Sequence, residues 1–294
     1  MLFTSLAFRW LDETAAKQVD SDARFAKTRM IGMMDDNLDG KLQKAELKGQ
    51  MGGMLGGFFA RIDTDGDQAD VLPTDTQKNT AYAFAREHGV GEAEDFAALL
   101  ARHFVDSQPS IHQARVHIEE YSWERLDGAP HSFAQSGPDV RTATVTYDGQ
   151  RERTLSGLTG LVLLSSTGSE FTGFVKDRWT TLAEATDRIL CTSVDATWRH
   201  TARPDDWGKS FAAARAALTE AFADTYSRSL QQTLYAMGER LLASCPGAAE
   251  VRLSLPNRHH FLVDLAPFGL ENPGEVFHVD DRPYGLIEGT VLAP

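Results

Sequence analysis

The sequence predicts an α+β fold in which strands and paired helices alternate, preceded by a small helical segment. The first observation is that helix-like and strand-like spacings of apolar residues follow one another after residue 70, with two helices between strands occurring twice. The second is an acidic twelve-residue loop between helical patterns, which marks the first 70 residues as a separate unit. We therefore expect three parts, over residues 1–70, 71–155 and 156–294.

Composition and charge limit the class of protein. Of the 294 residues, 42% are hydrophobic and 24% charged, as in soluble globular proteins, and no apolar run is long enough to span a membrane. The formal net charge of −13 argues against a nucleic-acid partner, so an anionic ligand would have to be bound by a local arginine. Two cysteines, Cys191 and Cys245, and a start unlike a secretory signal fit a cytoplasmic protein.

Residues 35–46 have the spacing of an EF-hand calcium loop. Gly40 stands at the sixth position, where such a loop turns sharply. The predicted ligands are the side chains of Asp35, Asn37 and Asp39, the main-chain carbonyl of Lys41 and both carboxylate oxygens of Glu46. We expect Ca²⁺ here, and the simpler alternative is an acidic turn between two helices.

A second loop of the same kind begins and then fails. Asp63, Asp65 and Asp67 occupy its first, third and fifth positions. However, Gln68 replaces the glycine at position six, and Thr74 replaces the bidentate glutamate at position twelve. We expect weak or no calcium binding there.

The region after residue 70 reads as a mixture of helices and strands. Helices are expected over residues 76–86, 92–104, 211–223 and 229–242, the first with Asp75 or Thr76 as its N-cap. Strands are expected over residues 114–119, 142–147, 158–164, 190–198, 251–255 and 261–265. Because the helix pair recurs, these elements suggest an internally duplicated α+β unit.

Seven short motifs occur in this region in a specific order. They are PTDTQKNT (73–80), LSGL (155–158), SSTGSEF (165–171), DRIL (187–190), VDATW (194–198), SLQ (229–231) and LPNRH (255–259). From about residue 70 to about 291 the chain resembles urate oxidase (uricase). The resemblance implies two tandem tunnelling-fold domains, each an antiparallel four-stranded sheet with two helices after its second strand. It also implies a homotetramer with active sites at subunit interfaces.

The resemblance assigns substrate-binding roles to several residues. Arg188 and Gln231 would grip opposite edges of the urate anion, and both side chains suit its carbonyl and N–H groups. Phe171 would stack on the ring, Leu230 would contribute a backbone contact, and Asn257 would hold dioxygen or water above the ring plane. Taken alone, such residues are more often a core aromatic, a surface arginine or a solvated amide, so the motif context carries these assignments.

The resemblance also implies a proton relay. Thr74 and His259 match two of its members, and Asp75 matches a residue whose backbone meets the ligand from the neighbouring subunit. Such a relay suits histidine because its pKa lies near neutral pH. Neither a metal nor an organic cofactor is expected for catalysis. Urate would reduce O2 directly and give 5-hydroxyisourate and hydrogen peroxide.

The family's opening strand pair, with the lysine that completes the relay, has no match in the first 70 residues. None of the lysines there stands in the expected context: Lys17, Lys27, Lys41, Lys44 and Lys48. The sequence thus predicts a first domain without its opening strands and a relay without an assigned lysine. Two alternatives to an active enzyme follow: an EF-hand protein fused to an inactive urate-binding body, or a non-catalytic purine-binding scaffold.

Overall fold

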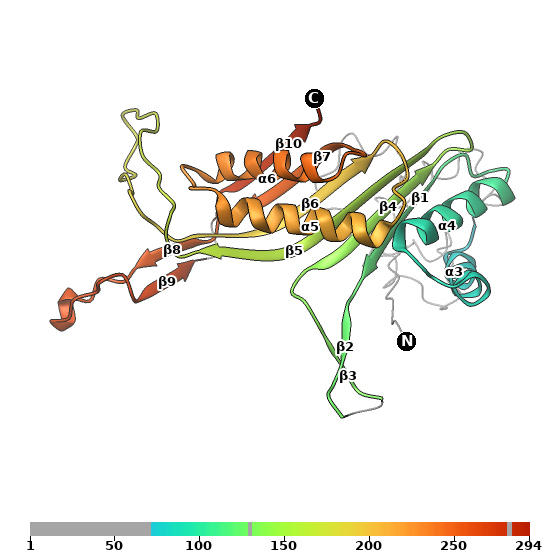
Figure 1. Ribbon diagram of the computed structural model, residues 1–294, viewed down its shortest axis with the longest axis horizontal. Helices are drawn as coiled ribbons and strands as arrows, with labels where there is room; N and C mark the ends of the chain where they lie inside the picture. Colours follow the sequence, from blue (N-terminus) through green and yellow to red (C-terminus); the bar gives the residue numbers. More distant parts are fainter. Residues whose placement is uncertain (1–71, 129–130, 281–283) are drawn as a thin grey trace, which may run out of the picture.

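The computed structural model describes residues 72–128, 131–280 and 284–294. These residues form a six-stranded antiparallel sheet with the order β1-β4-β5-β6-β7-β10 (Figure 1). Its strands are β1 (Ala114–Glu120), β4 (Val140–Tyr147), β5 (Glu152–Ser165), β6 (Leu190–His200), β7 (Ala248–Pro256) and β10 (Leu286–Leu292). In the described part of the chain, no helix combines the length and apolarity needed to cross a membrane.

Two helix pairs and two hairpins complete the architecture. The helices are α3 (Thr74–His88), α4 (Ala93–Ser107), α5 (Trp207–Asp224) and α6 (Leu230–Ser244), with a short 3-10 helix, η2 (Ala266–Phe268). One hairpin joins β2 (Trp123–Arg125) to β3 (Phe133–Gln135), and the other joins β8 (His259–Leu262) to β9 (Phe277–Asp280). Both hairpins project beyond the body of the sheet (Figure 1).

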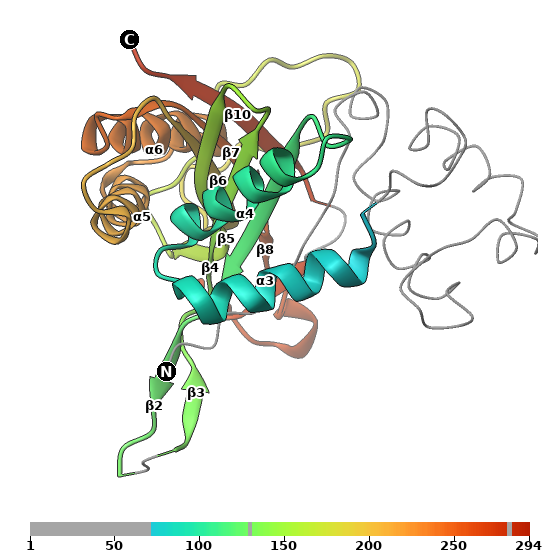
Figure 2. The same cartoon turned by 90° about the vertical axis from the view of Figure 1, so that its right-hand side faces the viewer.

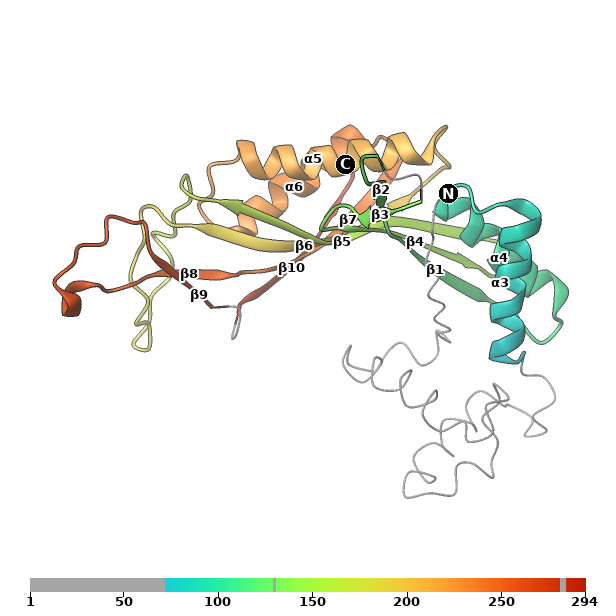
Figure 3. The same cartoon turned by 90° about the horizontal axis from the view of Figure 1, so that it is seen from below.

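The second helix pair packs closely on the sheet. Helices α5 and α6 lie side by side on one face of the sheet, as the edge-on view in Figure 3 shows. Gly238 of α6 is needed there, because a Cβ atom at this position would lie 2.5 Å from Cγ2 of Val291 in β10. Trp198 and Leu218 are fully buried between these layers. This close contact holds α6 against β10.

The first helix pair covers less of the sheet. Phe96, Leu100 and Phe104 on one side of α4 are buried against β1 and β4. Helix α3 lies further out (Figure 2), and Ala81 is its single fully buried residue. Strand β1 forms one edge of the sheet, since within the described residues it pairs with β4 alone.

The structure confirms all four expected helices and corrects two local predictions. Helix α3 begins at Thr74 after Pro73, so Asp75 and Thr76 are not its N-cap. The Asp75 carboxylate instead binds within the first turn, to Lys78 and to the side-chain amide of Asn79. The strand expected over residues 261–265 is β8, which spans His259–Leu262 and so ends earlier.

The predicted division after residue 155 falls inside β5, which pairs with β4 on one side and β6 on the other. The sheet is therefore continuous across that division. The separation into two domains and a first segment stays a prediction, and residues 1–70 lie outside the described residues.

Candidate active site

The loop between β5 and β6 is folded back on itself. Phe171 and Ala185 exchange two backbone hydrogen bonds, of 2.7 and 3.1 Å. Near the start of the loop, the Asp187 carboxylate accepts a hydrogen bond of 2.8 Å from the Thr167 hydroxyl and one of 3.2 Å from the Gly168 amide. These contacts hold both ends of the loop together immediately before β6.

Arg188 is positioned by this closed loop. Its backbone amide donates to the Ser169 carbonyl at 2.8 Å, and its Nε donates to the Ser169 hydroxyl at 3.3 Å. The centre of its guanidinium lies 5.2 Å from the centroid of the Phe171 ring. Partial burial lowers the pKa of Arg188, but the side chain stays charged at neutral pH because an arginine pKa starts so high.

The start of α6 is bound to the same loop. The Glu170 amide donates to the Ser227 carbonyl at 2.8 Å, and the Ser227 amide donates to the Gly168 carbonyl at 3.0 Å. Helix α6 begins at Leu230, directly after its N-cap Ser229, and Leu230 is buried while Gln231 is exposed. Gln231 therefore projects from the first turn of a helix whose end is tied to the Arg188 loop.

Asn257 and His259 reach the same end of the sheet from β7 and β8. The Arg258 amide donates to the Cys191 carbonyl at 2.9 Å, and Asn257 forms a bridge with Thr192. Cys191 and Thr192 follow Arg188 by only three and four positions. The structure thus gathers six predicted site residues at one end of the sheet: Phe171, Arg188, Leu230, Gln231, Asn257 and His259.

Thr74 and Asp75 are not among them. They form the first turn of α3, which lies at the opposite end of the sheet from the β5–β6 loop and the β8–β9 hairpin (Figures 1 and 3). Within one chain, the predicted relay threonine is therefore separated from the predicted relay histidine.

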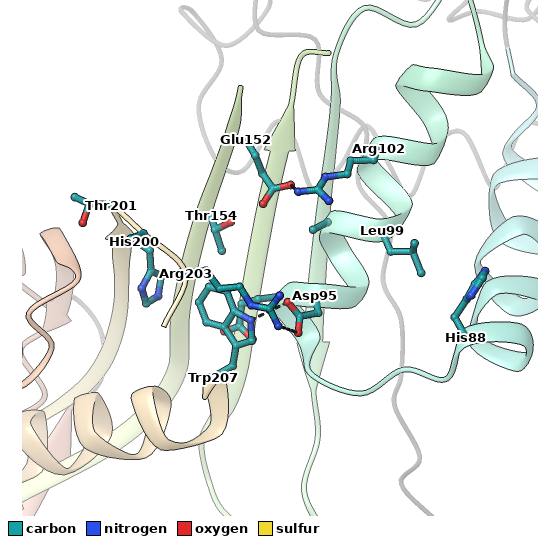
Figure 4. A pocket seen from close by; sticks show the side chains of 13 residues that line it. His88, Asp95, Leu99, Arg102, Glu152, Thr154, His200, Thr201, Arg203 and Trp207 are labelled. Carbon is teal, nitrogen blue, oxygen red and sulfur yellow. Dashed lines mark hydrogen bonds and ion pairs between the residues drawn. The ribbon is translucent and has the colours of Figure 1, made fainter. Parts of the chain in front are cut away.

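A cavity of about 600 Å³ lies elsewhere, where α4 meets β5, β6 and α5 (Figure 4). Its charged groups already have partners, since Arg203 pairs with Asp95 at 2.8 Å and Arg102 pairs with Glu152 at 2.8 Å. Burial lowers the pKa of His200 on its wall to about 4. The cavity contains none of the predicted site residues, so it is not the candidate active site.

Similarity to known proteins decides the family. The uricase family model matches residues 61–146 and 154–288. The chain belongs to the uricase family. It is 42% identical over 266 residues to the uricase of Arthrobacter globiformis, covering 90% of this chain and 86% of that one. It is 38% identical over 259 residues to the Aspergillus flavus uricase, covering 81% and 85%.

The fold agrees with that assignment. The crystal structure of the Arthrobacter globiformis uricase superimposes with a TM-score of 0.76 at 46% identity, covering 80% of this chain and 82% of that one. As a member of this family the chain is a urate oxidase, an oxidoreductase whose catalysis uses no cofactor. The alternative of an EF-hand protein with an inactive body is not favoured by these matches.

The uricase match extends further toward the N-terminus than the motifs alone indicated. Because it begins at residue 61, it includes Asp63, Asp65 and Asp67 of the incomplete second loop. The match to the Arthrobacter uricase, at 90% of the chain, also reaches well into the first 70 residues. The ligands predicted for Ca²⁺, from Asp35 to Glu46, lie outside the described residues. Among the residues that are described, no cluster of histidine, cysteine or carboxylate side chains is placed for a metal ion.

Two residues that build the site were recognised only as members of motifs. Ser169 binds Arg188 through both its carbonyl and its hydroxyl, and Asp187 closes the loop. Both occur in the quoted motifs, but residue spacing gives no indication of hydrogen bonds between positions 19 or 20 residues apart. Their position within shared motifs was the one available signal.

Proposed function

We propose that this urate oxidase binds urate between Arg188 and Gln231, with Phe171 stacked against the ring. The observation that carries the proposal is the placement of the Arg188 guanidinium 5.2 Å from the Phe171 ring, in a loop hydrogen-bonded to the residues that precede α6. A guanidinium supplies two parallel donors to one edge of a planar anion. The amide of Gln231 supplies a donor and an acceptor to the other, and the N-terminus of α6 favours the negative charge.

Asn257 and His259 are suited to the reaction of urate with O2. Both follow the end of β7, whose bridge to Thr192 places them at the end of the sheet where β6 begins. We assign Asn257 to hold O2 or water over the ring, and Leu230 and Asp75 to contact urate through their backbones. His259 and Thr74 would pass the proton that urate releases as it transfers electrons to O2. No lysine is assigned to this relay, and turnover should be slowed if the chain supplies none.

A complete site then requires a second chain, because Thr74 and His259 lie at opposite ends of one subunit. Exposed apolar side chains on the β8–β9 hairpin and its connection are surfaces that another subunit would cover. They are Phe261, Leu262, Phe268, Leu270, Val276 and Val279. We propose a homotetramer with active sites between subunits, acting in the cytoplasm.

The test is the rate at which urate loses its ultraviolet absorbance. Arg188→Lys keeps the charge but loses the planar pair of donors, and Gln231→Leu removes both amide contacts. We expect each variant to lower kcat/KM on the order of 100-fold, as two lost bonds to an anion would. Arg178→Lys is the matched control, since Arg178 is exposed in the same loop and stacks on Trp179. Unchanged kcat/KM in the first two variants would place urate elsewhere.

A second candidate function rests on the twelve-residue loop of residues 35–46. We propose that it binds Ca²⁺ independently of urate oxidation, with Glu46 supplying two oxygens. Calorimetric titration with calcium should release heat with the parent protein and none with Glu46→Ala. Equal heats would mean that calcium binds elsewhere, and no heat from either protein would mean that the protein does not bind calcium.

A further inference from the structure

We infer that the buried hydroxyls of Ser227 and Thr233 are positioning residues for urate binding. They fix the start of α6, and with it Gln231, against the loop that carries Arg188. The inference rests on the proposed function, because it assumes that Arg188 and Gln231 hold the substrate. It adds the hydrogen bonds that set the distance between Arg188 and Gln231.

The hydroxyls form a chain in the interior. Thr233 is 0% exposed and Ser227 is 2% exposed. The Thr233 hydroxyl donates to Oγ of Ser227 at 2.8 Å, and the Ser227 hydroxyl donates to the carbonyl of Ser229 at 3.2 Å. Buried hydroxyls are costly unless they are hydrogen-bonded, so this chain specifies one arrangement of residues 227–233.

The chain continues to Arg188 through the backbone. Ser227 forms a parallel bridge with Ser169, donating to the Gly168 carbonyl and accepting from the Glu170 amide. Ser169, itself 0% exposed, lies between those two residues and binds Arg188 at both its amide and its Nε. One continuous set of hydrogen bonds therefore links Thr233, two residues after Gln231, to the Arg188 guanidinium.

Such a link is useful because the two gripping side chains come from different elements. A rigid planar ligand tolerates little error in the separation of groups that bind its two edges, and supporting hydrogen bonds usually set that separation. Thr233 belongs to the buried face of α6, together with Leu230, Leu234 and Met237, and valine has nearly the same volume as threonine. A hydroxyl at this position therefore serves orientation more than packing.

The experiment compares Thr233→Val with Thr233→Ser, which restores the hydroxyl. Losing one hydrogen bond that positions the site should raise KM for urate about threefold to tenfold. The Kd of xanthine, a planar purine that shares most of urate's edge groups, should rise by the same factor, while kcat changes less than about twofold. Thr233→Ser should behave like the parent. Thr144→Val is the control, because Thr144 is buried and bonds the His117 ring at 2.8 Å in β4, away from the site.

A purely structural role would lower thermal stability in Thr233→Val and Thr144→Val alike without raising KM in either, and that result overturns the inference. If Thr233→Val does not fold, Ser227→Ala removes the hydroxyl that accepts from Thr233 and donates to Ser229, and it must also raise KM. The rise should be the smaller one, because Thr233 keeps the Ser229 carbonyl as an acceptor at 3.2 Å. The proposed function fails separately, since Arg188→Lys and Gln231→Leu would then leave KM unchanged. If those two variants weaken binding while Thr233→Val does not, the inference alone is wrong.

Discussion

The two helix pairs of this protein cover unequal amounts of sheet. Helices α5 and α6 pack over strands β5, β6, β7 and β10, whereas α4 covers β1 and β4 and α3 lies further out. Six residues of α5 are buried: Trp207, Ala214, Ala217, Leu218, Ala221 and Phe222. In α3, which is the corresponding first helix of its pair, Ala81 alone is buried.

The residues proposed for the active site are also divided between these two regions. We call α3, α4, β1 and β4 the first half of the protein, and β5, β6, β7, β10, α5 and α6 the second half. The residues proposed to grip urate, Arg188 and Gln231, belong to the second half, which has the larger hydrophobic core. Those proposed to act from a neighbouring subunit, Thr74 and Asp75, begin the less buried helix α3. Precise positioning of a ligand requires side chains held by packed surroundings. The comparison teaches that, if the proposed site is right, its binding residues lie beside the more deeply buried helix pair, and Thr74 and Asp75 begin the helix with the fewest buried residues.

The largest expected effect comes from truncating one aromatic side chain in each half. Phe222→Ala in α5 removes a buried ring, and we expect it to lower the free energy of unfolding by about 3–5 kcal/mol. Phe84→Ala in α3 removes a half-buried ring that packs beside His103, so about 1 kcal/mol is expected. Urea unfolding followed by circular dichroism measures both. Equal losses would mean that α3 is as firmly packed in the assembled protein as α5.

The next effect concerns the junction of the halves. Arg141 in β4 binds Glu94 at 2.7 Å and Glu92 at 2.9 Å, and its guanidinium lies 5.0 Å from the Phe211 ring of α5. Glu94 is 1% exposed, so Arg141→Met leaves a buried carboxylate without its main partner. Removing one member of such a pair costs about 2–4 kcal/mol where one group keeps slight exposure.

The double variant Arg141→Met, Glu94→Gln is the control for this prediction. It removes both charges and should recover part of the lost stability in the same unfolding measurement. A single cooperative transition in Arg141→Met would show that the halves unfold together. Two separate transitions would show that the first half unfolds on its own, and that it is less stable than the second half.

Much of the main fold could be predicted from the sequence, because long elements carry a clear apolar pattern. Helix α4 and strand β6 were predicted to within three residues at each end. The missed elements lack that pattern. All three residues of β2 are exposed, and in β10 only Val291 is buried while Gly289 contributes no apolar side chain. The pairing of β10 also depends on β7, which lies about 30 residues earlier in the sequence, and periodicity does not reveal such a partner.

The site was predictable in a different way. No spacing rule brings Arg188 over Phe171, because that contact depends on the closed loop between residues 165 and 190. The order of the motifs identified both residues through resemblance. The same approach gave no role to Ser227 and Thr233, since buried hydroxyls in a helix-start sequence look like ordinary capping residues.

The smallest expected effect is a pH dependence at the junction. The Nε2 atom of His200 lies 2.9 Å from the Ser156 hydroxyl, which donates to the Glu94 carboxylate at 2.6 Å. A neutral imidazole with its proton on Nε2 completes this chain. Burial favours that neutral form and lowers the pKa of His200 from 6.5 to about 4. Between these two values the unfolded chain binds more protons than the native protein, so His200 contributes stability above pH 6.5 that is lost as the pH falls toward 4.

The variant His200→Gln keeps a donor to Ser156 but does not titrate. After allowance for partial solvent exposure, the parent should lose about 1–2 kcal/mol more than this variant between neutral pH and pH 4. Urea unfolding at several pH values measures the difference. Parallel losses in both proteins would mean that His200 is already hydrated in the native state. Water would then reach the junction between the two halves, around Glu94, Ser156 and His200. The first half would be attached loosely at this junction, as α3 is at the outer side of the molecule.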